Sequence, residues 1–241
     1  MTLQRTWQAA ADLIWSADCA GCGRELASPL CGPCRADLLG PVSRRESSAP
    51  RLNPADGGPA LPVWCAAWYA GTVRHAIVAW KRTGRYELSR EMTRAIARSA
   101  EAVGPVLAKI TSDLVVAPVP SRLARRWSRP GGGTEALALA VAEALTGAGL
   151  PARPSMALAR THWSKDQAGQ ASRQRQAGRE GTTLVRTRPD QPVLLVDDVL
   201  TTGATLLDAE RALARAGCQT LGAVVLAVSP PSGQVPDARG V

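Results

Sequence analysis

The feature that most constrains this 241-residue chain is an aliphatic run that ends in two adjacent carboxylates and then turns into a helix. The run reads VLLVDDVLTTGAT and covers residues 193–205. Its apolar part predicts a central strand of a parallel sheet at 193–197, and buried charges at the end of such a strand cost free energy unless a partner satisfies them. A partner or a ligand must therefore meet the two carboxylates.

A helix and a second apolar strand follow this run, so the three elements form a βαβ unit. The helix is expected at 205–217, where Gly217 ends it, and the strand at 220–228. A helix that connects two strands in this way makes them parallel. The other expected elements are strands at 63–70 and 113–120 and helices at 74–80, 90–103 and 134–149, the last with Thr134 as its N-cap. The fold class is therefore α/β, with a mostly parallel sheet flanked by helices over residues 63–229.

Three further segments differ in composition from this domain. Residues 1–40 contain four of the six cysteines and begin with an amphipathic helical pattern. Residues 41–62 are rich in Pro, Ser, Gly and Arg without apolar periodicity, which predicts a linker or a mobile loop. Residues 230–241 are expected to be a disordered tail.

The four N-terminal cysteines form two CxxC pairs, Cys19–Cys22 and Cys31–Cys34. Four thiolates at this spacing suit one tetrahedral Zn²⁺, and a module of this size has little core without a metal. Two disulfides are the alternative, which the absence of a signal peptide disfavours. The expectation is a small N-terminal module with structural zinc. Cys65 and Cys218 lie in apolar patterns and are expected in the core.

The net charge of +9 permits phosphate-bearing ligands or nucleic acid as partners but does not choose between them. Of the 29 basic residues 26 are arginine, so part of this charge reflects composition. No apolar run reaches the length of a membrane span, and the N-terminus lacks the long apolar core of a secretory signal. We therefore expect a cytoplasmic protein without a transmembrane segment.

The acidic strand end has the chemistry of a ribose-phosphate site. Asp197 and Asp198 offer acceptors for vicinal hydroxyls, and the following turn offers hydroxyls and N–H groups at a helix N-terminus, where anions bind. Gly203 permits a backbone shape that a side chain would obstruct. The P-loop and GxGxxG motifs are absent from the sequence. A structural reading, in which an Asp caps the helix, explains one carboxylate and leaves the other unexplained.

This stretch resembles the ribose-5-phosphate fingerprint of type I phosphoribosyltransferases. With a four-Cys module ahead of it, the chain resembles the ComF family, which is linked to competence and DNA uptake. The segment YAGTVRHAIVAWKRTGR resembles the family segment that supplies a lysine, here Lys81. VVAPVPSRLARRW resembles its PVP segment, and DQAGQASRQRQAGREG resembles its flexible loop, with Gln167 as the matching glutamine. The resemblance implies a type I phosphoribosyltransferase-like sheet preceded by a small zinc-binding module.

The resemblance also implies a role for each candidate residue. Asp197 and Asp198 would hold the ribose hydroxyls of phosphoribosyl pyrophosphate, with Mg²⁺ bridging to the pyrophosphate, and they are the candidate catalytic residues. The implied ligand-binding stretch continues through Val199, Leu200, Thr201, Thr202, Gly203, Ala204 and Thr205, and its threonines and Gly203 would hold the 5-phosphate. The implied pyrophosphate donors are Val119, Ser121 and Arg122. Lys81, one of only three lysines, would add a compact positive charge for a phosphate, although an ordinary exposed lysine explains it equally well.

Two functions follow from this reading. The first is a phosphoribosyltransferase that binds phosphoribosyl pyrophosphate with Mg²⁺ and transfers the phosphoribosyl group to a nitrogen nucleophile. The alternative is a non-enzymatic competence factor that uses the pocket as a ligand sensor. Its zinc module and basic surface would bind single-stranded DNA or a DNA-import helicase, at the inner face of the membrane. A simple zinc-ribbon nucleic-acid binder leaves the Asp pair unexplained.

Overall fold

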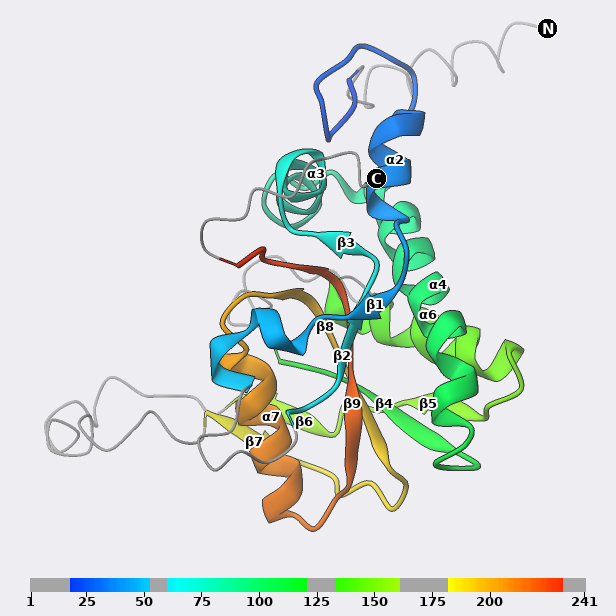
Figure 1. Ribbon diagram of the computed structural model, residues 1–241, viewed down its shortest axis with the longest axis vertical. Helices are drawn as coiled ribbons and strands as arrows, with labels where there is room; N and C mark the ends of the chain where they lie inside the picture. Colours follow the sequence, from blue (N-terminus) through cyan, green and yellow to red (C-terminus); the bar gives the residue numbers. More distant parts are fainter. Residues whose placement is uncertain (1–17, 53–59, 121–132, 161–181, 232–241) are drawn as a thin grey trace, which may run out of the picture.

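A seven-stranded sheet covered by helices on both faces forms the body of the protein (Figure 1). The structure is a computed structural model that describes residues 18–52, 60–120, 133–160 and 182–231. The strands of this sheet are β1 (Ser43–Arg44), β2 (Val63–Cys65), β3 (Ala67–Trp68), β4 (Leu114–Pro118), β5 (Ala152–Pro154), β8 (Val193–Leu200) and β9 (Thr220–Val228). A separate antiparallel pair consists of β6 (Leu158–Arg160) and β7 (Thr183–Val185).

The helices lie between these strands along the chain, except for the first one, which precedes β1. The α-helices are α2 (Gly32–Leu38), α3 (Gly71–Arg82), α4 (Ser89–Leu107), α6 (Thr134–Gly147) and α7 (Ala204–Arg215). Three short 3-10 helices are η1 (Glu46–Ser48), η2 (Pro50–Leu52) and η3 (Tyr86–Leu88). None of the helices in the described part of the chain is long and apolar enough to cross a membrane.

The sheet is parallel except at one edge. Its order is β1-β2-β9-β8-β4-β5, and β3 also pairs with β9. Only β1 runs antiparallel to its neighbour, β2. The β8–α7–β9 unit is the predicted parallel βαβ unit, and β9 has the predicted bounds. The mixed α/β fold with a mostly parallel sheet is therefore confirmed.

The side chains of β8 divide the core between the two faces of the sheet. Leu194 and Val196 pack in the apolar cluster that includes α3, α4 and α6, whereas Val193 and Leu195 pack in the cluster that includes α7. This alternation follows from the two-residue repeat of a strand. Because both faces are covered, all of β8 is buried apart from the half-buried Val199, as expected for a central parallel strand.

The segment expected to be a linker is partly built into the fold. Within 41–62, β1 pairs with β2 through Ser43 and Cys65, and the side chains of Ala49 and Leu52 are fully buried. The linker interpretation is therefore wrong for residues 43–52. The segment lacks apolar periodicity because isolated apolar residues, such as Ala49 and Leu52, make its contacts with the core. Their neighbours are mostly Pro, Ser and Arg.

Two local predictions also differ from the structure. The strand expected at 63–70 is divided into β2 and β3. Thr134 is the first residue of α6 and not its N-cap, which is Gly133 with a φ of 69°. A glycine adopts this φ without strain, and the chain can therefore enter the helix from a left-handed position. The predicted N-terminal helical pattern, the 230–241 tail beyond Pro231 and the loop around Gln167 lie outside the described residues.

Candidate functional site

The two carboxylates of the candidate site lie in the C-terminal half of β8, a central strand of the sheet. Asp197 and Asp198 are only 9% and 7% exposed. The strand continues past them to Leu200, so they stand within the strand and not at its end. Because an unpaired buried charge costs free energy, each of these carboxylates needs a polar or charged partner.

Lys81 supplies the partner that the sequence required. This lysine, in the last turn of α3, forms an ion pair with Asp198 through Nζ and Oδ2. Asp197 has a different partner, since its Oδ1 accepts a hydrogen bond of 2.8 Å from the backbone N–H of Asp198. The fold thus brings together three of the predicted site residues from segments more than one hundred positions apart.

Burial also determines the protonation of this group. It raises the pKa of Asp197 to about 7, although the positive charge of Lys81 acts in the opposite direction. Burial likewise lowers the pKa of Lys81, and the charge of Asp197 opposes that change. Close to neutral pH, the protonated and ionised forms of Asp197 are therefore both populated. A cation or a pair of hydroxyl donors would favour its ionised form.

The turn after β8 leads directly into the N-terminus of α7. Gly203 is the N-cap of α7 with a φ of 82°, a left-handed value that favours glycine. Thr201, Thr202 and Thr205 are exposed beside it. The first N–H groups of a helix have no partner within the helix, and the one bond of this kind described here, from Ala204 to the Thr202 hydroxyl, is long at 3.4 Å. These donors and hydroxyls are available to an anion.

A segment that sequence reasoning missed supports this turn. A Cβ atom at Gly203 would lie 2.6 Å from Leu52 Cγ and 3.2 Å from Ala49 Cβ. The backbone N–H of Arg51 donates to the Thr202 carbonyl at 3.0 Å. Glycine is therefore required here by close packing against η2 as well as by its φ. No local pattern indicates this contact, because the two segments are distant in the sequence.

Two of the predicted ligand-binding residues, Val119 and Leu200, have backbone hydrogen bonds within the sheet region. The N–H of Val119 donates to the Val196 carbonyl at 2.8 Å, so it is not a free donor for pyrophosphate. The side chain of Leu200 is buried in the cluster under α7, and its carbonyl accepts from the N–H of Ser229 at 2.8 Å. Both residues hold the strand ends in place. Ser121 and Arg122 lie outside the described residues.

The four N-terminal cysteines converge on one point. Their Sγ atoms all lie within 4.8 Å of one another, and those of Cys22 and Cys31 are 3.7 Å apart. Four sulfurs around a tetrahedral zinc, each at 2.3 Å, lie about 3.8 Å from one another. All six cysteines of the chain are in the described residues, and none of them forms a disulfide there. Cys65 and Cys218 are buried, as predicted.

The immediate surroundings of the sulfurs fit a metal centre. The backbone N–H of Cys31 donates to Cys19 Sγ at 3.3 Å, and a Cβ at Gly21 would meet Cys34 Sγ at 2.8 Å. Burial raises the pKa of Cys19, but the N–H groups around its sulfur outweigh burial and lower it to about 6. Burial and the neighbouring sulfurs raise the pKa of Cys34 above its ordinary value. A divalent cation would relieve this crowding of thiols, and four sulfurs leave no open position for a substrate.

The cysteine module is fixed to the helices that lead to the site (Figure 1). Arg35 of α2 makes two hydrogen bonds to the Glu91 carboxylate of α4, at 2.9 and 3.0 Å. Thr72 of α3 donates to Asp37 at 2.7 Å, and His75 of the same helix contacts the Gly21 carbonyl at 3.0 Å. One side of α3 thus binds the module, while its C-terminal end carries Lys81.

Comparison with known proteins identifies the C-terminal half. Residues 123–241, just under half of the chain, match the family model described as phosphoribosyl transferase domain. This range includes Asp197, Asp198 and the Gly203 turn, and it excludes Lys81 and the four cysteines of the module. A solved purine phosphoribosyltransferase from Pyrococcus horikoshii Ot3 is similar at 18% identity and a TM-score of 0.33, over 59% of this chain and 78% of that chain. No curated protein matches the sequence. The chain therefore carries a phosphoribosyltransferase-type domain.

Proposed function

We propose that this protein binds phosphoribosyl pyrophosphate, or a related ribose 5-phosphate compound, and transfers the phosphoribosyl group to a nitrogen nucleophile. The observation that carries this proposal is the buried Asp197–Asp198 pair on β8, close before the turn at Gly203. The pair and the turn fall inside the range that matches the phosphoribosyl transferase domain. A ribose with a 5-phosphate requires hydrogen-bond acceptors for its hydroxyls and donors for its phosphate, and the pair and the turn offer these two kinds of group.

In this proposal the two carboxylates accept the 2′- and 3′-hydroxyls of the ribose. The N–H groups at the start of α7 and the hydroxyls of Thr201, Thr202 and Thr205 bind the 5-phosphate. Carboxylate oxygens and pyrophosphate oxygens are the ligands that Mg²⁺ prefers, so Asp197 and Asp198 would hold the ion when the ligand is bound. Bound Mg²⁺ supplies charge neutralisation for the departing pyrophosphate.

Lys81 has two tasks in this proposal. In the free protein it neutralises the buried Asp198 carboxylate. When the ligand's hydroxyls occupy Asp198, the ammonium group becomes available to a phosphate oxygen. The reaction would break the bond from C1 to pyrophosphate, which leaves with the bonding electron pair. The nitrogen lone pair would form the new bond to C1, and the proton on nitrogen would pass to solvent. The negative charge of Asp198 would stabilise the positive charge that develops on the ribose ring. Ser121 and Arg122 are the further pyrophosphate donors that we propose.

We also propose that the four-Cys module holds one structural zinc ion, on the basis of the converging sulfurs. The order of a four-Cys module followed by a phosphoribosyltransferase-type domain supports membership of the ComF family. In this role zinc takes no part in the reaction, because four protein ligands complete its tetrahedral shell.

The test is calorimetry of the purified protein with phosphoribosyl pyrophosphate and Mg²⁺, followed by a pyrophosphate-release assay with a panel of nucleobases. We expect binding in the wild type and a strong loss of affinity in Asp197→Asn and Asp198→Asn. Asp190→Asn is the matched control, since Asp190 is exposed shortly before the other end of β8. Equal affinity in all four proteins would refute the ribose site.

A non-enzymatic DNA-uptake factor is the second candidate, favoured by the net charge of +9 and by the four-Cys module. Such a protein would use the same pocket as a ligand sensor and would bind single-stranded DNA or a DNA-import helicase beside the membrane. The two candidates differ in turnover. Ligand binding without pyrophosphate release for any nucleobase, together with binding of single-stranded DNA, would favour the second.

A further inference from the structure

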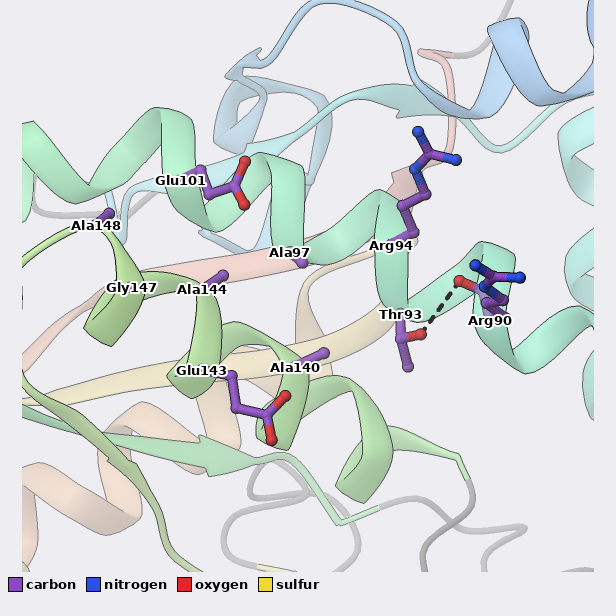
Figure 2. A pocket seen from close by; sticks show the side chains of 10 residues that line it. All are labelled: Arg90, Thr93, Arg94, Ala97, Glu101, Ala140, Glu143, Ala144, Gly147 and Ala148. Carbon is purple, nitrogen blue, oxygen red and sulfur yellow. Dashed lines mark hydrogen bonds between the residues drawn. The ribbon is translucent and has the colours of Figure 1, made fainter.

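A groove on the outer side of α4 and α6 has an ordered arrangement of charge that the proposed function does not use (Figure 2). Small residues line its centre, namely Ala97 of α4 and Ala140 and Ala144 of α6. Two arginines lie toward one end of the groove and two glutamates toward the other in Figure 2. The arginines are Arg90 and Arg94, and the glutamates are Glu101 and Glu143.

The two helices that form the groove lie side by side in the same direction. Gly104, near the end of α4, is close to Leu145 and Ala148 at the end of α6, since a Cβ on Gly104 would meet their side chains at 3.6 and 3.8 Å. The opposite sides of both helices are buried against the sheet, through residues such as Ile96 and Val141. The groove is therefore the face that the sheet leaves uncovered.

The charges along this groove are exposed and unpaired within the described residues. Arg90, Arg94, Glu101 and Glu143 are all exposed, and no ion pair joins any of them to another described side chain. Arg94, Ala97 and Glu101 follow one another at spacings of three and four positions, so they lie on one face of α4. Ala97 thus separates a basic end from an acidic end.

We propose that this groove is the interface with a second copy of the same chain, related by a two-fold axis close to Ala97. If this axis is perpendicular to α4, it turns the helix antiparallel to its counterpart and places the basic end of one copy against the acidic end of the other. Arg94 and Glu101 lie about 4.5 and 6 Å from Ala97 along the helix axis, so the two charges meet within about 1.5 Å of the same level. The small residues at the centre let the helices approach closely.

Self-association explains the charge pattern better than another partner does. A nucleic acid would be repelled by the two glutamates, and a uniformly basic or acidic peptide would match only one end of the groove. The four charges sum to zero within each groove, so the groove itself adds no like-charge repulsion between two copies. The groove and its own two-fold image are complementary at both ends.

A charge-swap experiment tests this interface. The full chain, Arg94→Glu, Glu101→Arg and the control Arg215→Glu are examined by sedimentation equilibrium over a range of concentrations. We expect dimers of the wild type and of Arg215→Glu, because Arg215 is exposed on α7, on the other side of the sheet. Each of the two groove variants places like charges opposite each other twice and should lose the dimer.

Mixing the two groove variants provides the decisive measurement. In a heterodimer of Arg94→Glu with Glu101→Arg, each position 94 again faces an opposite charge at position 101 of its partner, so the dimer should return. Recovery also shows that both variants are folded. A monomeric wild type, groove variants that remain dimeric, or a mixture of folded variants that stays monomeric would each overturn the proposal. Circular dichroism of each variant alone checks that it is folded.

Discussion

Adjacent carboxylates on one buried strand have different partners in this protein, and this difference governs the response of the site to pH. Asp198 is neutralised by Lys81, whereas the described hydrogen bond of Asp197 comes from a backbone N–H. Burial raises the pKa of Asp197 to about 7 from an ordinary value of 3.8. The folded protein therefore binds one proton more tightly at this residue than the unfolded chain does.

We predict that this proton makes the free energy of unfolding decrease as the pH rises. The folded pKa lies above the unfolded value, so the stabilisation is present below about pH 4 and is lost as the pH approaches 7. Asp197→Asn should remove this part of the pH dependence. Urea unfolding of the wild type and Asp197→Asn at several pH values measures it, with Asp190→Asn as the control. A pH slope in Asp197→Asn equal to that of the wild type would contradict the prediction.

A second prediction concerns the exposed hydroxyl of Thr202. Replacement by alanine removes one charge-assisted hydrogen bond to the phosphate, so Thr202→Ala should weaken binding of ribose 5-phosphate by about 1–2 kcal/mol. Because Thr202 is exposed, thermal stability should remain unchanged. Calorimetry and thermal melts measure the two quantities. Unaltered affinity would show that this hydroxyl does not touch the phosphate.

A third prediction concerns Gly203, which both packs against Leu52 and begins the helix of the proposed phosphate site. Gly203→Val should lower the free energy of unfolding and abolish phosphate binding. The backbone at this position has a left-handed φ that strains valine, and the valine side chain would collide with Leu52. Leu52→Ala should destabilise the Gly203→Ala variant less than it destabilises the wild type, because in the variant it also removes the colliding side chain. Urea unfolding compares the variants. An equal cost of Leu52→Ala in the wild type and in Gly203→Ala would argue against the Leu52 contact.

At the scale of elements, α3 connects the cysteine module to the candidate site. Its first half contacts the module through Thr72 and His75, and its last turn places Lys81 on Asp198. The apolar side chains Leu30 and Leu38 of the module belong to the same buried cluster as Ile77 and Trp80 of α3. The module is therefore part of the main core and not a separate unit.

We predict that loss of the metal affects the whole chain. Cys31→Ser with Cys34→Ser should release the zinc, lower the melting temperature of the entire protein and weaken ligand binding, since α3 loses its support. Metal analysis, thermal melts and calorimetry measure these effects. Cys218→Ser, in the core on the other face, should retain the metal. Full zinc content in the double serine variant would refute the metal site.

The elements that could be predicted from sequence are those with a strong local pattern. The apolar runs of β8 and β9 and the amphipathic helix between them indicated a parallel unit, and CxxC spacing indicated a cluster of four sulfurs. The contacts of Leu52 with Gly203 and of Val119 with Val196 depend on residues far apart in the chain. Such contacts leave no periodic signal. For the same reason Lys81 was a candidate phosphate ligand before the structure placed it on Asp198.

At the scale of the whole molecule, the sheet is assembled from segments that are distant in sequence. Val63 of β2 lies opposite Ala223 of β9, and Val116 of β4 lies opposite Leu194 of β8. The range that matches the phosphoribosyl transferase domain contains β8 and β9 but neither of the strands that flank them.

We therefore predict that a fragment of residues 123–241 does not fold by itself. Without β2 and β4, both edges of the β8–β9 pair are open, and open apolar edges aggregate. The fragment should show no cooperative thermal transition and should scatter light, whereas the full chain should melt cooperatively. A cooperative melt of a monomeric fragment would contradict this prediction.

The central position of β9 also has a consequence for synthesis on the ribosome. β2 is translated early and can pair with its parallel neighbour only when β9, the last strand of the described residues, has been made. Until then the nascent chain holds two incomplete half-sheets, with β2 on one side and β8, β4 and β5 on the other. Their apolar edges are exposed during this interval, which is the period when chaperones bind unfinished proteins. The β2–β9 edge of the sheet therefore cannot close before Val228 has been translated.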